Sequence, residues 1–302
     1  MRGLARLAMR GPMFAAGCAA VLALASMVFG VLLVPAGAVI ALTTLRFGAR
    51  EGLKTAAIAT SLVVVVRLAL GQGLGHALLV AATIWLPAWL MANVLRVRPA
   101  QDGPLMLAAS MVLMYAAAFR LAVGDVAAFW RGMLKTFFEL MAKDAGAHFK
   151  AEQMDFIASQ MHSWTLIAMF VLFGAAILLA RWWQAELFNP GGFGSEFREL
   201  RMPRGVTMVA GALALAYAFG REGVLLLDLA GDACVLLVVL FALQGLAVIH
   251  FMARVRGLAG AWLTTLYVVL ALVPQVAGPI LATTGLADNI VDFRRLSGAR
   301  QP

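Results

Sequence analysis

Long runs of apolar residues, separated by short polar segments, follow one another along the whole chain. A helix needs about 20 apolar residues to cross a bilayer, or somewhat fewer where it is short or broken. The runs predict spans at residues 13–34, 53–70, 76–95, 104–123, 164–179, 206–220, 224–252 and 258–285, with a shorter apolar piece at 36–45. Pro274 and Pro279 interrupt the last of these spans.

The runs are continuous, whereas the strands of a membrane β-barrel alternate apolar and polar residues. Helices and closed barrels are the only structures that satisfy their backbone polar groups in hydrocarbon, so the continuous pattern favours helices. We therefore expect an all-α fold, a polytopic transmembrane helix bundle of about eight or nine spans. It would form a single integral membrane domain over residues 1–302.

The segment 124–163 has a different pattern. Charged residues recur there at every fourth position and form one polar helix face, at Arg131, Lys135, Glu139 and Lys143. Aromatic, leucine and methionine residues supply the opposite face. Such a division is typical of a helix that lies in the membrane interface. We therefore predict one amphipathic interfacial segment here.

The composition supports a membrane protein. The chain is 63% hydrophobic and 13% charged, whereas soluble domains are about 45–50% apolar and about 25% charged. The net charge of +9 would suggest a nucleic-acid partner in a soluble protein. Here the basic residues lie mostly in short loops between apolar runs, as the positive-inside rule expects. The expected partner is the lipid bilayer and not nucleic acid.

The same distribution predicts an orientation. Basic residues gather at 46–54, 96–98, 181–204 and 254–256. With a cytoplasmic N-terminus, the loop 181–205 is cytoplasmic and the segment 124–163 is extracytoplasmic. We expect a multi-pass protein of the bacterial cytoplasmic (inner) membrane. Nine crossings would place the C-terminus outside, whereas Arg294 and Arg295 favour the inside, so its side stays open.

No catalytic signature is present: the sequence has no phosphate-binding loop, no HExxH and no GxSxG. Cys18 and Cys234 lie inside apolar runs and make neither a disulfide framework nor a metal-ligand spacing. The histidines fall at span ends or in the amphipathic segment, and we interpret them as interfacial residues: His76, His148, His162 and His250. We expect no enzyme activity, no catalytic residues, no metal site and no cofactor.

Charged residues inside the predicted spans are the first candidates for a binding site, because they are costly there and often functional. Asp228 and Asp232 are four residues apart and share one helix face. With Arg120 they either line an outward-facing cavity for a polar small molecule, or Asp228 pairs with Arg67 or Arg120 near the headgroups. Gln244 lies in mid-span and can hydrogen-bond across a helix interface.

Two further segments are candidates for contacts with partner subunits. Ala15, Ala19 and Ala23 recur at four-residue spacing, which lets another helix approach closely. The loop 181–205 carries an aromatic pair and a turn-forming stretch. It serves either as a docking surface or as a stiff connector, and its candidate residues are Trp182, Trp183, Asn189, Gly191, Gly192, Phe193, Arg198 and Arg201.

The block RWWQ…NPGGF…EF, which begins at Arg181, and the block LADN…DFRR, which begins at Leu286, resemble the YybS-like family of bacterial membrane proteins. That family has no established activity. More distantly, the first half of the chain, with FGAREG at 47–52, is similar to the substrate-binding S components of energy-coupling-factor transporters and to MreD. In S components an Ala-x-x-x-Ala surface docks the coupling subunit.

Two functions follow as hypotheses. The first is an S-component-like subunit that binds a small molecule and acts in uptake with other membrane subunits. Its predicted site is Asp228, Asp232 and Arg120, covered by the amphipathic segment. The second is a membrane scaffold in envelope or cell-shape assembly, without a ligand, that depends on the loop 181–205.

Overall fold

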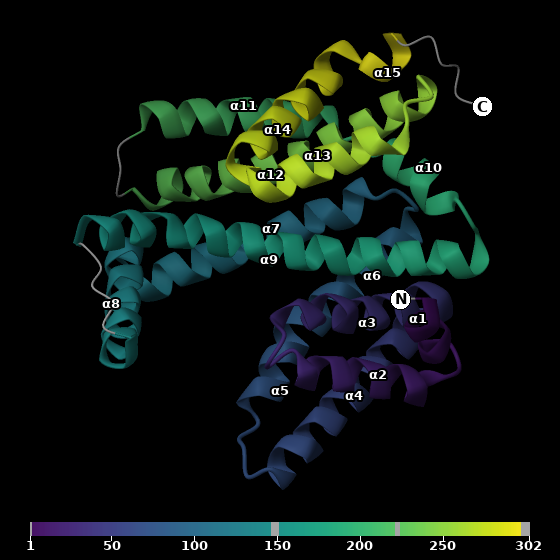
Figure 1. Cartoon of the computed structure of the whole chain (residues 1–302), viewed down its shortest axis with the longest axis vertical. Coiled ribbons are helices and arrows are strands. Elements are labelled where there is room, and N and C mark those ends of the chain that lie inside the picture. Colours follow the sequence, from purple (N-terminus) through teal and green to yellow (C-terminus); the bar gives the residue numbers. More distant parts are fainter. Residues whose placement is uncertain (1, 146–150, 221–223, 297–302) are drawn as a thin grey trace. The chain divides into compact units, whose positions relative to one another are not determined.

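The computed structural model describes residues 2–145, 151–220 and 224–296. Within these ranges the chain is helical, with short connections and no strand (Figure 1). His148 and part of the predicted amphipathic segment lie outside the described residues. The helices are α1 (Arg2–Ala8), α2 (Pro12–Ala25), α3 (Leu33–Phe47), α4 (Ala49–Ala69), α5 (Gly75–Val80), α6 (Leu86–Val97), α7 (Asp102–Val123), α8 (Val126–Ala145), α9 (Ala151–Phe188), α10 (Gly192–Arg198), α11 (Arg204–Phe219), α12 (Leu225–Val255), α13 (Gly260–Leu272), α14 (Pro274–Val291) and α15 (Phe293–Leu296).

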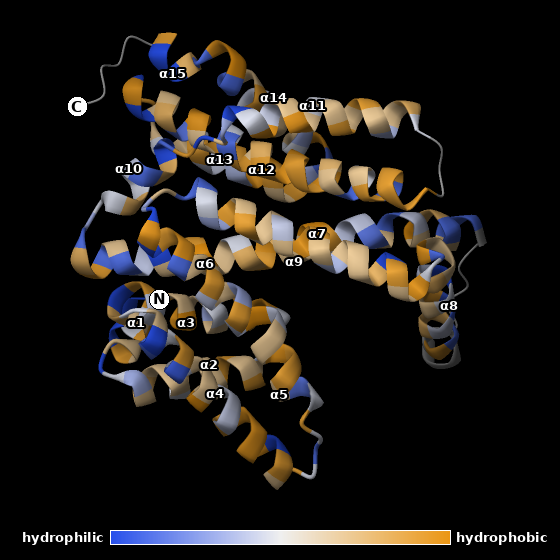
Figure 2. Cartoon of the chain, turned by 180° about the vertical axis from the view of Figure 1, so that it is seen from behind, coloured by the Kyte–Doolittle hydropathy of each residue, from blue (hydrophilic) through white to orange (hydrophobic). Residues whose placement is uncertain are grey.

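Six helical stretches of the described chain are long and apolar enough to cross a membrane, judged by length and composition. They are Gly30–Phe47, Ala49–Ala69, Gly75–Val97, Asp102–Val123, Glu152–Phe188 and Leu225–Val255. Three shorter apolar helices accompany them, at Pro12–Ala25, Arg204–Phe219 and Gly260–Leu272. Figure 2 shows apolar residues along most helices, with hydrophilic residues at helix ends and short helices such as α1, α10 and α15. The predicted all-α fold of apolar, membrane-length helices is confirmed.

The first predicted span, 13–34, is wrong as a single helix. Helix α2 ends at Ala25, and Ser26 donates a hydrogen bond to the carbonyl of Ala23 (2.7 Å). A 3₁₀ turn at Gly30–Leu32 then leads into α3. Pro35 lies in the first turn of α3, where its missing N–H breaks no intrahelical bond, so it belongs to the start of a helix and not to the end of one.

The helix that contains the predicted span 164–179 is much longer than expected. Helix α9 has 38 residues and contains the predicted span 164–179 in its middle. Its first part and α8 together make up the described part of the amphipathic segment. Its last part takes in the beginning of the predicted loop 181–205, which is therefore helical up to Phe188. The predicted turn follows at once: Pro190 lacks a donor, and Gly191 has a φ of 88° that favours glycine.

The last predicted span is interrupted at a proline, as expected. Helix α13 ends at Leu272, and Pro274 opens α14, which continues to Val291. Asp292, with a left-handed φ of 56°, then ends α14. The LADN block therefore lies in the last turns of α14, and DFRR lies at the α14–α15 junction.

The helices pack into two compact units. Unit 1 comprises Met1–Ala108, Val171–Arg204 and Leu240–Pro302. Unit 2 comprises Ala109–Phe170 and Gly205–Val239. In unit 1, α2 packs on α3 and α4, and α3 also packs on α6. Gly52 is the second glycine of the FGAREG motif. A Cβ at this position would lie 1.9 Å from the Thr44 hydroxyl oxygen, so the absence of a side chain here lets α4 approach α3 closely.

Candidate functional site

A charge cluster lies within unit 2, where α7 meets α12. The Arg120 guanidinium donates to both oxygens of Asp232, from Nε to Oδ2 (2.7 Å) and from Nη2 to Oδ1 (2.9 Å). Its Nη1 lies 3.5 Å from Oδ2 of Asp228. The shared helix face predicted for the two aspartates therefore brings both to one arginine. Of the two predicted partners, Arg120 is the one in contact, while Arg67 donates to the carbonyl of Gly73.

His162 on α9 completes this cluster, which we call the charge cluster: Arg120, His162, Asp228 and Asp232. The imidazole Nε2 lies 3.3 Å from Oδ2 of Asp232, and the ring stacks on Phe119 with centroids 5.6 Å apart. The His162 side chain is 6% exposed, so it is buried within unit 2, in a contact with Asp232 that the sequence did not predict. His162 was missed because it precedes the apolar run that predicted this span. Helix α9 begins well before that run and therefore includes His162.

Two buried polar atoms near the charge cluster have no hydrogen-bond partner among the described residues. One is Nδ1 of His162 and the other is Nε1 of Trp130, whose ring lies 6.0 Å from that of Phe119. When the carboxylate of Asp232 accepts from Nε2–H, the neutral imidazole offers Nδ1 as an acceptor. The indole N–H is a donor. Buried polar groups are normally satisfied, so each of these two atoms has a hydrogen bond still to be completed.

The formal charge of the cluster is negative when the imidazole is neutral, because one guanidinium faces two carboxylates. Asp232 is almost fully buried, whereas the side chain of Asp228 is 31% exposed and meets the arginine only at 3.5 Å. The uncompensated charge therefore belongs mainly to Asp228. In the low dielectric of a helix bundle such a charge attracts a cation strongly.

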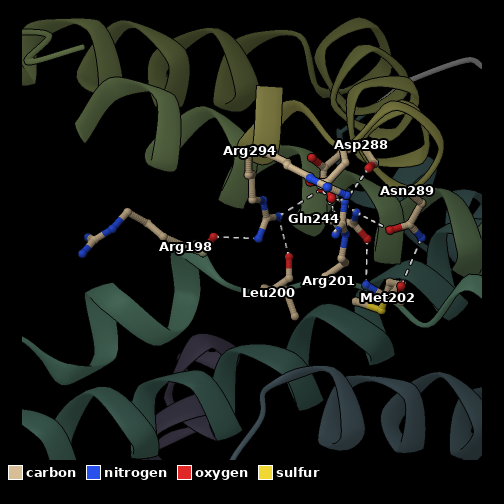
Figure 3. A network of polar contacts seen from close by, with 10 residues as sticks. Arg198, Leu200, Arg201, Met202, Gln244, Asp288, Asn289 and Arg294 are labelled. Atoms are coloured by element: carbon tan, nitrogen blue, oxygen red, sulfur yellow. Dashed lines mark hydrogen bonds and ion pairs between the residues drawn. The ribbon is translucent and has the colours of Figure 1, made fainter. Parts of the chain in front are cut away.

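A second group of polar contacts lies within unit 1 and holds the segment between α10 and α11 to the end of α14 (Figure 3). Gln244 of α12 is fully buried; its Oε1 accepts from the backbone N–H of Met202 (2.8 Å). Its Nε2 donates to Asn289 (2.8 Å) and to Asp288 (3.1 Å) on α14. The prediction that Gln244 hydrogen-bonds across a helix interface is confirmed.

Two arginines extend these contacts. Arg201 donates to the carbonyl of Asp288 (2.7 Å) and pairs with Asp292 (3.0 Å). Arg294 donates to the carbonyls of Arg198 (2.8 Å) and Leu200 (2.7 Å). We call this set the loop–tail network: Arg198, Leu200, Arg201, Met202, Gln244, Asp288, Asn289, Asp292 and Arg294. It joins residues 198–202, directly after the first of the two sequence blocks, to the second block at the end of α14.

The loop–tail network predicts a loss of stability in acid. The hydrogen bond from Arg201 holds the pKa of Asp292 below its ordinary value, so its stabilising contribution is complete above that value and is lost as pH falls through the folded-state pKa. We expect Asp292→Asn to lower the thermal midpoint at pH 7, and the difference from wild type to shrink below about pH 4. Thermal unfolding in detergent from pH 7 to 3 checks this, and a difference independent of pH would contradict it.

The predicted docking residues are placed as follows. Ala15, Ala19 and Ala23 are fully buried on the face of α2 that packs against α3 and α4 of the same chain, so they present no surface to another subunit. Both tryptophans belong to α9; the side chain of Trp183 is fully buried and that of Trp182 is half-buried. The remaining loop candidates are exposed at Asn189 and Gly191 and half-buried at Gly192, Phe193, Arg198 and Arg201.

Within the described part of unit 1, a pair of cavities borders the loop between α6 and α7. One, of about 360 Å³, is lined among others by Arg96, Arg181 and Asn189. The other, of about 270 Å³, is lined by residues 98–102 of the loop and by residues 196 and 199–201 of the α10–α11 segment. We call this second one the loop-end cavity. Among the described residues no group of three or more His, Cys, Asp or Glu side chains is placed to hold a metal ion.

The fold and the buried charges together define the class: an all-α protein with several helices of membrane-spanning length and polar side chains paired in its interior. Comparisons of the chain with protein-family models, with curated proteins and with solved structures give no match.

Proposed function

We propose that this protein is a non-enzymatic subunit of the bacterial cytoplasmic membrane that binds a small organic cation at the charge cluster and acts in its uptake. The observation that carries the proposal is the pair of unpartnered buried atoms, Nδ1 of His162 and Nε1 of Trp130, beside a cluster with an uncompensated negative charge. Ionisable groups inside membrane helices commonly mark ligand or ion pathways.

The surrounding side chains favour a protonated amine over a metal ion. Phe119, Phe129 and Trp130 form an aromatic group, with Phe129 edge-on to Phe119 at 5.2 Å. Aromatic faces attract organic cations through cation–π interactions. An amine N–H can donate to Nδ1 of His162 while the charge approaches Asp228. The resemblance of the first half of the chain to S components supports an uptake role with partner subunits.

Asp228→Asn tests the site because it removes the uncompensated charge and nearly preserves side-chain shape. We expect the variant to lose a bound cation, with affinity reduced at least about tenfold, or about 1.4 kcal/mol. Native mass spectrometry of protein purified gently from its own host membrane measures the bound mass. Glu139→Gln is the matched control, since it removes one charge from an exposed position of α8 in the same unit. A cation that is retained by Asp228→Asn would refute the site.

The alternative proposal is a membrane scaffold in envelope or cell-shape assembly. It is supported by the exposed turn residues Asn189 and Gly191 directly before α10, and by the ion pair of Arg181 with Glu196, which holds α10 to α9. The same mass-spectrometry experiment separates the two proposals. Wild-type protein that carries no small molecule, and that is recovered with envelope or division proteins, would favour the scaffold.

A further inference from the structure

We infer that the larger cavity of the pair beside the α6–α7 loop binds a phosphate group. This cavity, of about 360 Å³, lies within unit 1 and is lined by residues of α3, α6, the α6–α7 loop and the end of α9. We call it the arginine cavity. Its volume falls within the usual range for ligand sites, about 300–1,000 Å³. The site goes beyond the proposed cation site, which lies in the other unit.

The main observation is the side chain of Arg96, near the end of α6. Arg96 is exposed and lines the cavity, and its guanidinium forms no hydrogen bond or ion pair with the described residues. Both of its Nη atoms lie 3.5 Å from the position that a Cβ would take on Gly48, so the guanidinium rests against the turn between α3 and α4. An arginine offers five N–H donors in a planar fork, which matches the oxygens of a phosphate group.

The charges around the arginine cavity favour an anion. No carboxylate lines it in the described part of the chain. Its other arginine, Arg181, is neutralised by Glu196, which accepts from Nε (2.9 Å) and from Nη2. A further guanidinium, that of Arg46, lies 4.2 Å from the ring centroid of Phe188, which lines the cavity, and it has no ion-pair partner among the described residues. Positive charge is therefore in excess here.

Two side-chain amides add uncharged donors to the lining. Oε1 of Gln184 accepts from Arg181 (3.2 Å), which leaves the Nε2 of Gln184 free to donate. The side chain of Asn189, in the turn after α9, is exposed and forms no hydrogen bond with the described residues. The donors thus come from both α6 and the end of α9. A tetrahedral phosphate accepts from several directions, whereas a planar carboxylate accepts mainly in one plane, so this arrangement favours phosphate.

The loop-end cavity lacks these features. Its arginines are already paired, Arg98 with Asp102 (3.1 Å) and Arg201 with Asp292 (3.0 Å). Glu199 adds an exposed negative charge to its lining. A phosphate group would meet repulsion there, so basic residues in the lining are not sufficient and the unpaired guanidinium distinguishes the arginine cavity.

The phosphate can belong to a lipid headgroup or to a soluble compound. The arginines that line the cavity belong to the segments 96–98 and 181–204, which the positive-inside rule expects on the cytoplasmic side. Anionic phospholipids gather at that surface and bind basic pockets between membrane helices. A soluble phosphate compound would reach the cavity from the same side, so the experiment has one arm for each source.

Arg96→Gln is the main test variant. Because the Arg96 side chain has no partner among the described residues, the thermal midpoint of the ligand-free protein should stay unchanged. Affinity for the phosphate should fall at least about tenfold, because a charge-assisted hydrogen bond is lost. Asn189→Asp is a second variant, which adds a negative charge to the lining and leaves Arg96 in place. Arg256→Gln is the matched control, since Arg256 is exposed in the turn after α12 in the same unit and on the same expected side.

The experiment uses the full-length protein, delipidated in an uncharged detergent. In the lipid arm, native mass spectrometry follows a titration with dioctanoyl phosphatidylglycerol, and dioctanoylglycerol, which has the same acyl chains and no phosphate, is the negative ligand. In the soluble arm, isothermal titration calorimetry measures binding of inorganic phosphate. We expect saturable binding of at least one phosphate probe, weakened at least about tenfold in Arg96→Gln and in Asn189→Asp and kept in Arg256→Gln. Binding of the lipid alone identifies a headgroup, and binding of inorganic phosphate identifies a soluble phosphate compound.

Four results would overturn the inference. They are no binding of either probe to wild type, equal binding of dioctanoylglycerol with no binding of inorganic phosphate, undiminished binding by Arg96→Gln, and an equal loss of binding in Arg256→Gln. If Arg96→Gln lowers the thermal midpoint, Asn189→Asp decides, and undiminished binding by that variant then overturns the inference.

Discussion

Gly285→Ala is expected to disrupt the packing of α14 against α12. A Cβ at this position would lie 2.0 Å from the carbonyl oxygen of Phe241 and 2.7 Å from the backbone nitrogen of Gly245. Both are backbone atoms, so no side-chain rotation can relieve the overlap and the two helices must move apart. Overpacking of this kind costs about 1–3 kcal/mol and sometimes more.

Moving α14 away from α12 would also disturb the loop–tail network. Asp288 and Asn289 follow Gly285 within about one helical turn and receive the hydrogen bonds of Gln244. Moving α14 away lengthens these bonds and leaves the fully buried amide of Gln244 unsatisfied, which costs about 1–3 kcal/mol in addition. We therefore expect a lower thermal midpoint in detergent and a reduced yield of folded protein.

Gly278→Ala is the control for this prediction, because it makes the same change in the same helix. No heavy atom lies within 4 Å of a Cβ built there. Alanine is favoured over glycine inside a helix by about 1 kcal/mol, so this variant should be neutral or slightly more stable. Equal stability of Gly285→Ala and Gly278→Ala would show that α12 and α14 do not pack as closely as described.

Asp232→Asn is expected to have the second large effect. Asp232 receives both strong hydrogen bonds of Arg120 and lies beside His162, with a side chain 5% exposed. Removing its charge leaves a mostly buried guanidinium whose remaining partner, Asp228, is 3.5 Å away. Breaking a buried ion pair by removing one partner costs about 3–5 kcal/mol.

Two comparisons make the test specific. Asp155→Asn removes the carboxylate from the pair with Arg131, in which both side chains are more than half exposed, and should cost less than about 1 kcal/mol. The double variant Arg120→Leu/Asp232→Leu removes both buried charges together and should recover much of the lost stability. Unfolding of this double variant and of the single variants Arg120→Leu and Asp232→Leu in detergent gives the coupling energy of the cycle. A cost for Asp232→Asn no larger than that for Asp155→Asn would contradict the charge cluster.

The local pattern of apolar and polar residues was sufficient to predict much of the fold. Continuous apolar runs predicted helices, the four-residue spacing placed Asp228 and Asp232 on one face, and the mid-span position of Gln244 predicted a bond between helices. The turn after Phe188 followed from Pro190 and Gly191. Helix ends were less well predicted, because apolarity continues through the break after Ala25 and stops well before the true end of α9.

The sequence by itself determined the class of fold and which residues are costly to bury, since both depend on side-chain chemistry and on spacing of a few residues. Only the tertiary structure decided their partners. Arg120 and Asp232 are 112 residues apart, and Arg294 reaches Leu200 across 94. Such pairs depend on how whole helices pack, and on close approaches such as that of Gly285 to Phe241, which no local pattern records. For the same reason His162 could be recognised as unsatisfied only after its surroundings were in place.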